Sequence, residues 1–349
     1  MQPVASRLDS TIDRRLWGMR DLAPLFPEYT NQDPPIAEIW LTGASCRLAS
    51  GPFAGRELAE AWRQMPVAWK GTRCAQDAQI SLLVKFLFPG EKPSIQVHPD
   101  DEYAAKHEAA RGGRGKTEMW HVLAAKPGAE LFLNLQPGVS PESFRRAIED
   151  GTLEPLISRI PVAPGDSIFV PPGTVHTIGA GIMLCEIMEQ SDITYRVYDY
   201  KRKGPDGRER PLHVRQALDV INFGEQLGEK VSPVRYAGRG LTVDYIAACR
   251  YFATERWAFD VPVGGVTSPG SFELVVFLSG TGQIGSGEAK LPYSRMQVWF
   301  LPAALGAYQI EPAEPTVALH TSVPDLDSYS RRLADLGIPS EEWSRIIHL

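Results

Sequence analysis

The chain alternates short apolar runs with turns rich in glycine and proline along most of its length. Apolar runs of about four to eight residues bounded by such turns are typical of β-strands, and helix-period patterns are few. The expected strands include residues 37–41, 80–88, 94–98, 118–123, 131–133, 167–170 and 183–188. Many short strands separated by turn signals predict a mainly β protein built as a sandwich or barrel.

A few helices are expected between these strands. Asp100 is placed to N-cap a helix that runs through about Ala110. Residues 140–149 form a second helix, because Pro141 suits the first helical position. Residues 213–223 form a third helix, and we expect it to separate two β-rich regions.

The second β-rich region runs from about residue 241 to residue 322. Residues 293–302 repeat the turn–strand–proline layout found around Val170, but Leu305 and Gly306 follow where the first region has a histidine. We therefore expect this region to bind no metal. The expected domains are 1–212 (N-terminal, metal-binding), 213–240 (helical connector), 241–323 (C-terminal, metal-free) and 324–349 (helical tail).

Composition limits the classes of partner. Hydrophobic residues make up 43% and charged residues 22% of the chain, which is ordinary for a soluble globular protein. The net charge of −6 offers no general attraction to nucleic acid or acidic membranes, so an anionic ligand needs a local cationic cluster. The four scattered cysteines and the absence of an apolar N-terminal segment predict a cytoplasmic protein. We expect a monomer or a homodimer.

Residues 165–176, GDSIFVPPGTVH, place a histidine at a stiff turn between two strands. Gly165 begins a turn, residues 167–170 form a short strand, and Pro171 and the residues after it force a rigid turn. That turn presents His176 at the start of the next strand, a position suited to holding a metal ion.

A second group of metal-ligand side chains lies upstream. In a strand, side chains two residues apart share a face, so Ser94, Gln96 and His98 line one side. Glu118 begins another apolar strand 20 residues after His98. Two imidazoles, a carboxylate and an amide suit a borderline divalent ion such as zinc and leave positions for water or substrate. The candidate ligands are Gln96, His98, Glu118 and His176.

Four segments together resemble the signature blocks of the type I phosphomannose isomerases (mannose-6-phosphate isomerases), in particular their short bacterial form. They are SIQVHPDDEYA, GKTEMWH, VPPGTVHTIGAGI and EIMEQSDITYRVYDY. The resemblance extends over roughly residues 14–322. It implies two cupin-like (jelly-roll) β-barrels with a few connecting helices, the second barrel without a metal.

The resemblance also implies a reaction and a cofactor. It implies interconversion of mannose 6-phosphate and fructose 6-phosphate through an enediol, with one Zn²⁺ per chain or another divalent ion in its place. The small-molecule partner is then a phosphosugar, with no nucleic acid and no membrane involved. Because this chain lacks the large helical insertion of longer family members, we expect a more open pocket and looser specificity among phosphosugars.

Further site residues follow from the same resemblance. The expected catalytic residues are Lys116, Glu186, Asp192 and Arg196, and the expected phosphate-binding residues are Ser94 and Arg202. The guanidinium of Arg196 suits an oxyanion, and its alternative role is an ion pair with Asp192 or Asp199. Lys116, Glu186 or a metal-bound water could move the proton, and the sequence leaves all three open.

Two other functions compete with the isomerase. A cupin that binds metal and a sugar phosphate without catalysis would serve as a sensor or binding module. It would not need Lys116, Asp192 and Arg196 together beside the ligand set. An iron-dependent cupin oxygenase is the third hypothesis, and the Gln96 ligand fits it poorly.

Overall fold

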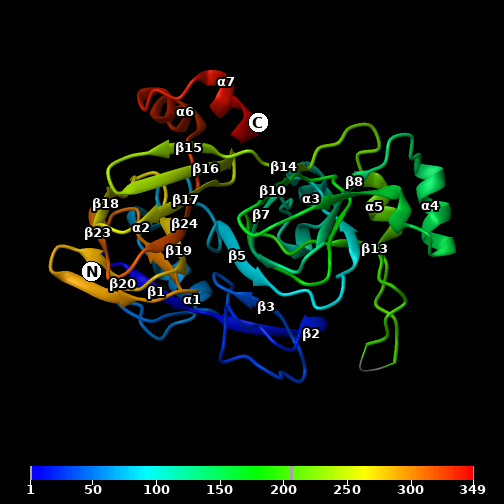
Figure 1. Cartoon of the computed structure of the whole chain (residues 1–349), viewed down its shortest axis with the longest axis horizontal. Coiled ribbons are helices and arrows are strands. Elements are labelled where there is room, and N and C mark those ends of the chain that lie inside the picture. Colours follow the sequence, from blue (N-terminus) through cyan, green and yellow to red (C-terminus); the bar gives the residue numbers. More distant parts are fainter. Residues whose placement is uncertain (1, 205–206, 349) are drawn as a thin grey trace. The chain divides into compact units, whose positions relative to one another are not determined.

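β-strands dominate the regular structure of the chain (Figure 1). The computed structural model describes residues 2–204 and 207–348. Its contacts divide the chain into two compact units. Unit 1 comprises Met1–Thr11, Trp40–Val84 and Val231–Leu349, and unit 2 comprises Ile12–Ile39 and Lys85–Lys230. The predicted mainly β class is confirmed.

Unit 2 is built on two sheets. The seven-stranded sheet has the order β14 (Glu229–Lys230), β10 (Ser167–Val170), β7 (Glu118–Ala125), β12 (Ile182–Glu189), β5 (Leu82–Leu87), β3 (Ile36–Trp40) and β2 (Thr11–Met19). The five-stranded sheet has the order β13 (Tyr195–Tyr198), β6 (Ile95–Val97), β11 (His176–Ile178), β8 (Glu130–Leu135) and β9 (Ile157–Pro161).

The two sheets of unit 2 share one hydrophobic core. The seven-stranded sheet contributes Trp120, Ile168 and Leu184, and the five-stranded sheet contributes Leu133 and Ile178. All five side chains are at least 95% buried, and each aliphatic one contributes on the order of 1.5–3 kcal/mol. Every second side chain along β7 and β12 therefore points into the space between the sheets, and this space holds the candidate site.

The helices of unit 2 include α3 (Asp101–His107), η1 (Ala109–Arg111), α4 (Pro141–Asp150), η2 (Glu154–Leu156) and α5 (Val214–Val220). Asp100 accepts a hydrogen bond from the Tyr103 N–H (2.8 Å), which confirms the predicted N-cap. The predicted run through Ala110 is broken at Glu108, where the backbone leaves the helical region. Figure 1 shows α4 and α5 beside the five-stranded sheet, and their buried side chains share a core with Val97 and Tyr195.

Unit 1 also contains two sheets. The nine-stranded sheet has the order β15 (Val234–Ala237), β16 (Leu241–Cys249), β17 (Ala253–Phe259), β24 (Thr316–Ser322), β19 (Glu273–Ser279), β22 (Val298–Leu301), β1 (Ser6–Asp9) and β4 (Arg47–Leu48), with β25 (Ile347–His348) beside β16. The four-stranded sheet has the order β18 (Val263–Val266), β23 (Ala307–Pro312), β20 (Gly282–Ser286) and β21 (Ala289–Tyr293).

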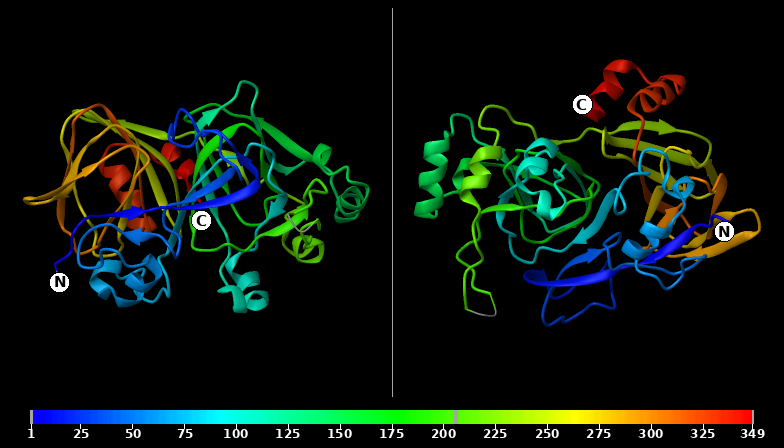
Figure 2. Two further views of the ribbon diagram at one scale, coloured as in Figure 1. Left: turned by 90° about the horizontal axis from the view of Figure 1, so that it is seen from below. Right: turned by 180° about the vertical axis from the view of Figure 1, so that it is seen from behind.

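The core of unit 1 contains Val275 and Trp299 from the larger sheet, and Ile284 and Ile310 from the smaller one. Its helices are α1 (Leu58–Gln64), α2 (Val67–Lys70), α6 (Leu326–Asp335), α7 (Ser340–Trp343) and η3 (Ser344–Ile346). The predicted helical tail is present as α6 and α7 (Figure 2).

The hydrogen-bonded pairing within residues 2–204 and 207–348 leaves all four sheets open at their edges. The structure therefore bears out the mainly β class without closing either unit into a hydrogen-bonded barrel. None of the helices in the described part of the chain is both long and apolar enough to cross a membrane.

Candidate metal centre and active site

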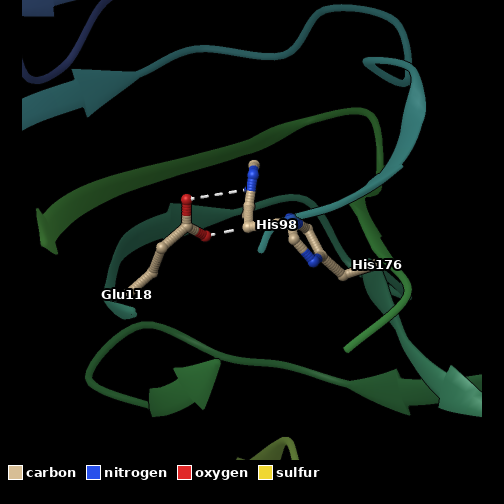
Figure 3. A group of neighbouring side chains, drawn as sticks. All are labelled: His98, Glu118 and His176. Carbon is tan, nitrogen blue, oxygen red and sulfur yellow. Dashed lines mark ion pairs between the residues drawn. The ribbon is translucent and has the colours of Figure 1, made fainter. Parts of the chain in front are cut away.

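Three strand ends in unit 2 bring His98, Glu118 and His176 together (Figure 3). His98 follows β6, His176 begins β11, and β6 and β11 pair with Gln96 opposite His176. The rigid turn before β11 is attached to β6, because the Gly173 N–H donates to the carbonyl of His98 (2.9 Å). One ligand atom from each of the three side chains falls within 4.8 Å of the others.

Backbone carbonyls orient both imidazoles. Nδ1 of His98 lies 2.8 Å from the carbonyl oxygen of Ile193, and Nδ1 of His176 lies 2.9 Å from that of Thr174. Each Nδ1 must carry the proton to donate to a carbonyl, so the lone pair is left on Nε2. The two Nε2 atoms lie 3.3 Å and 3.8 Å from the carboxylate oxygens of Glu118.

The donor set fits a divalent metal ion. Nε2 of His98 and both carboxylate oxygens of Glu118 are buried, and they have no hydrogen-bond partner within the described part of the chain. Nζ of Lys116 is 2.6 Å from one of these oxygens, but this ion pair does not have hydrogen-bond alignment. Leaving buried polar atoms unsatisfied costs about 1–3 kcal/mol each, and an ion placed among them would remove that cost.

The protonation states also suit a metal. Burial lowers the pKa of His98, and it lowers the pKa of His176 to about 3. Burial opposes ionisation of Glu118, but the charge of Lys116 holds its pKa well below the usual range. At neutral pH the cluster therefore presents two neutral imidazoles and one carboxylate, the forms that bind a divalent ion.

Gln96 borders this cluster. Its amide nitrogen lies 3.3 Å from Nε2 of His176, and its amide oxygen accepts a hydrogen bond from the Ser94 hydroxyl at 3.4 Å. Rotating the amide would present the oxygen to the cluster instead. The structure thus brings together the four side chains that the sequence analysis grouped, with Ser94 beside them.

Lys116 and Glu186 lie in the same interior. Burial acts to lower the pKa of Lys116, but the negative charges of Glu118 and Glu186 outweigh it. The net shift of the pKa is upward, so the amine stays charged. The Trp120 indole N–H donates to Glu186 (3.0 Å) from the neighbouring strand, where Trp120 and Glu186 are directly opposite. Burial and the charge of Glu118 raise the pKa of Glu186 to about 7.

Asp192 contacts a lysine that the sequence analysis did not single out. Its carboxylate lies 3.4 Å from Nζ of Lys85, and this ammonium also pairs with Glu38 at 3.5 Å. Lys85 is 3% exposed in a strand whose other residues are all apolar. A lone cation inside a fully buried apolar strand needs a charged partner, and that signal could have identified it.

Comparison with known proteins identifies the family. The chain matches the family model of the phosphomannose isomerase type I catalytic domain over residues 6–119. It is 33% identical over 311 residues to the Bacillus subtilis protein named "Probable mannose-6-phosphate isomerase GmuF", covering 87% of this chain and 95% of that protein. The chain belongs to the type I phosphomannose isomerase family.

Solved structures of phosphomannose isomerases share the fold. The mannose 6-phosphate isomerase from Bacillus subtilis is 27% identical, has a TM-score of 0.81, and aligns over 92% of this chain and 99% of its own. A second mannose 6-phosphate isomerase, described as zinc-bound, is 15% identical with a TM-score of 0.71, and aligns over 90% of this chain and 98% of its own. The resemblance found in the sequence is confirmed at the level of the family.

The two arginines expected in this phosphomannose isomerase site lie along β13 and the loop after it. Arg196 is opposite Gln96 in the β6–β13 pair, and its Nη1 donates to the carbonyl of Pro211 (3.1 Å). Its Nε is buried and has no hydrogen-bond partner among the described residues. Arg202 pairs with Asp199 (2.6 Å) and lines a cavity of about 510 Å³.

Proposed function

We propose that this chain interconverts mannose 6-phosphate and fructose 6-phosphate in a metal-dependent reaction. The observation that carries the proposal is the buried group of His98, Glu118 and His176, whose ligand atoms converge; Nε2 of His98 and both Glu118 oxygens have no hydrogen-bond partner among the described residues. The family of this chain supports the choice of reaction, because the relatives named above are mannose-6-phosphate isomerases.

The metal in the proposal is one zinc ion per chain. Gln96, His98, Glu118 and His176 would hold it, since two imidazoles with oxygen donors suit zinc. The solved relative described as zinc-bound supports this choice through its shared fold. When bound, the ion would supply positive charge that lowers the energy of negative charge developing on the sugar oxygens.

Glu186 is our choice for the group that moves the proton between C1 and C2. Its pKa of about 7 lets it accept and return a proton near neutral pH. The raised pKa of Lys116 argues against a base at that position. Its ammonium would instead stabilise the negative charge of the enediolate as it forms.

The remaining polar groups would bind and orient the substrate. The Nε donor of Arg196 is buried and has no partner in the described part of the chain, as expected for a group that contacts a sugar or phosphate oxygen. Ser94 and Arg202 are proposed to contact the phosphate. Asp192, paired with Lys85, is proposed to orient a sugar hydroxyl.

We also propose that each unit corresponds to one cupin-like jelly roll, because each consists of two sheets over one core. The expected domains stay a proposal: 1–212 metal-binding, 213–240 connector, 241–323 metal-free and 324–349 tail. Residues 1–11 and 40–84 of the proposed metal-binding domain fall in unit 1.

The test is isomerisation of mannose 6-phosphate by protein stripped with a chelator and then reloaded with zinc. We expect activity to disappear on chelation and to return with about one zinc ion per chain. Zinc bound at that ratio with no turnover would overturn the enzyme and favour the sugar-phosphate-binding module. Activity that survives complete removal of metal would contradict the metal dependence.

A further inference from the structure

Unit 2 contains a cation-rich cavity in an otherwise acidic chain. The cavity has a volume of about 510 Å³. Its positively charged lining residues are Arg14, Arg15, Arg202, Lys203, Arg208 and Arg210. Among the described residues, the carboxylates that line it are Asp199 and Glu209. Since the whole chain carries a net charge of −6, this local excess of positive charge is suited to a multiply charged anion.

Asp199 holds two of these arginines at once. Arg210 donates through Nε and Nη2 to the two carboxylate oxygens, both at 2.6 Å. Arg202 donates through Nη2 to one of the same oxygens, also at 2.6 Å. The side chain of Asp199 is only 5% exposed, so the two guanidiniums share one buried anchor. A guanidinium has five N–H groups, so both retain donors beyond those given to Asp199.

The carboxylates of Asp199 and Glu209, with that of Glu91 3.9 Å from Nη1 of Arg202, do not balance the six cationic side chains of the cavity. Burial lowers the pKa of Arg196, and the nearby charges of Arg210 and Arg202 lower it further. The pKa of Asp199 itself is held below its usual value, because hydrogen bonds from Arg210 and Arg202 outweigh the effect of burial. A bound dianion would relieve the repulsion among the three arginines.

Strand β13 links the cavity to the metal centre along the chain, because Arg196 lies on this strand and Asp199 follows it directly. Arg196 lies opposite Gln96, and directly opposed side chains on paired strands are about 4.5–5.5 Å apart at Cβ. Arg196 donates to the carbonyl of Pro211, the residue after Arg210 and itself part of the cavity wall. The short stretch from Arg196 to Arg202 therefore carries both a residue opposite the metal-centre border and residues of the cavity wall.

We propose that Arg202 and Arg210, both anchored by Asp199, form a two-guanidinium clamp for the phosphate group of the sugar phosphate. The clamp rests on the proposed function. Arg210 is the new phosphate-binding residue, and Asp199 is a positioning residue that fixes the planes of both guanidiniums. Two oriented guanidiniums can direct several N–H groups at the three terminal phosphate oxygens, which a single point charge cannot do.

The first test replaces Arg210 with glutamine and with lysine. For Arg210→Gln we expect the KM for mannose 6-phosphate to rise about tenfold to a hundredfold, as loss of charge-assisted hydrogen bonds predicts, with kcat changed less than threefold or so. The inhibition constant of inorganic phosphate should rise by a similar factor. Arg210→Lys keeps the charge but loses the two-pronged guanidinium. Its KM and its phosphate inhibition constant should lie between those of the wild type and those of Arg210→Gln. Arg159→Gln, which removes an exposed arginine paired with Glu130 in the same unit, is the matched control and should change neither constant.

The second test addresses Asp199 as a positioning residue. Asp199→Asn removes the shared anion, and we expect KM and the phosphate inhibition constant to rise together while the zinc content stays at one per chain. Asp199→Glu should restore part of the affinity. A loss of kcat with unchanged KM in Asp199→Asn would contradict the positioning role.

Failure of the clamp can be told apart from failure of the isomerase. Phosphate binding to the zinc-loaded wild-type protein and to Arg210→Gln is measured by calorimetry, whether or not the wild type turns over mannose 6-phosphate. Weaker phosphate binding in Arg210→Gln alone supports the clamp even in a protein without isomerase activity. Equal phosphate binding in both proteins, or an unchanged KM in an active Arg210→Gln, overturns it.

Discussion

Each unit of this protein buries a glutamate beside a histidine, and the two clusters treat their polar atoms in opposite ways. In unit 2, both oxygens of Glu118 and Nε2 of His98 lack hydrogen-bond partners among the described residues. In unit 1, Glu273 accepts a hydrogen bond from the Tyr308 hydroxyl (3.0 Å) and pairs with Nε2 of His320 (2.8 Å). In unit 2 the glutamate oxygens and a histidine Nε2 are left for a ligand. In unit 1 the glutamate and the histidine Nε2 bind each other, and only Nδ1 of His320 lacks a hydrogen-bond partner among the described residues.

The charges differ in the same way. Burial lowers the pKa of His176 to about 3. Burial also acts to lower the pKa of His320, but the charge and hydrogen bond of Glu273 outweigh it, so the net shift is upward. A buried histidine that stays neutral has a lone pair available to bind a metal ion. A histidine whose pKa is raised by a neighbouring carboxylate is protonated instead and forms an ion pair with it. Composition alone does not separate a catalytic cluster from a structural one; the hydrogen-bond partners do.

The largest expected effect comes from removing one histidine from each cluster. His176→Ala should lose bound zinc and at least about a thousandfold in kcat/KM, because a ligand and the charge it holds are lost together. His320→Ala should keep one zinc per folded chain and nearly full activity. The measurements are metal analysis and the isomerase assay. Equal zinc loss in both variants would remove the distinction between the clusters.

The next effect separates the proton-transfer group from the metal ligands. Glu186→Gln should lower kcat about 10²- to 10⁴-fold while zinc content stays at one per chain. In the wild type, a group with a pKa of about 7 should appear in the pH dependence of kcat/KM, which reports groups of the free enzyme. Its disappearance in the residual activity of Glu186→Gln would identify the titrating group. A variant with undiminished kcat would exclude Glu186 as the proton carrier.

The smallest effect concerns stability in unit 1. The raised pKa of His320 contributes stability below its ordinary value of 6.5, and this is lost as pH rises through the folded value. The lowered pKa of Glu273 contributes stability above its ordinary value of 4.5, and this is lost as pH falls through the folded value. His320→Gln should therefore lower Tm most between about pH 4.5 and 6.5, by roughly 2–4 °C per kcal/mol lost.

In the metal-free wild type, the contribution of His176 to stability should depend on pH in the opposite direction to that of His320. His176 resists protonation in the folded chain, with a pKa near 3. The unfolded chain takes up a proton there below about 6.5, so the contribution of His176 should fall as pH decreases from 6.5 toward 3. A Tm difference between His320→Gln and wild type that is independent of pH would contradict the ion pair in unit 1.

Much of the candidate site could be predicted from local sequence. Strand alternation placed Gln96 and His98 on one face, and the Pro–Pro–Gly turn fixed His176. Both rules depend only on neighbouring residues, so they survive without knowledge of the fold. The break in the helix at Glu108 was not predicted, since nothing in the apolar pattern changes there.

Other site residues were beyond the reach of local rules. Lys85 looks like an interruption in an apolar strand until Asp192, more than 100 residues later, is placed 3.4 Å away. Arg210 lies in a polar loop whose composition suggests only solvent exposure. Its relation to Asp199 follows from how the loop folds back on β13.

The sequence by itself determined the mainly β class, the family and the side chains able to hold a metal, because periodicity, turns and donor chemistry are written in short segments. Tertiary structure alone decided which of the buried glutamate–histidine clusters leaves its metal-binding atoms available to a ligand. It also decided that one carboxylate anchors two arginines at the edge of the site. Hydrogen-bond satisfaction and charge pairing depend on groups far apart in the chain, so only the folded arrangement sets them.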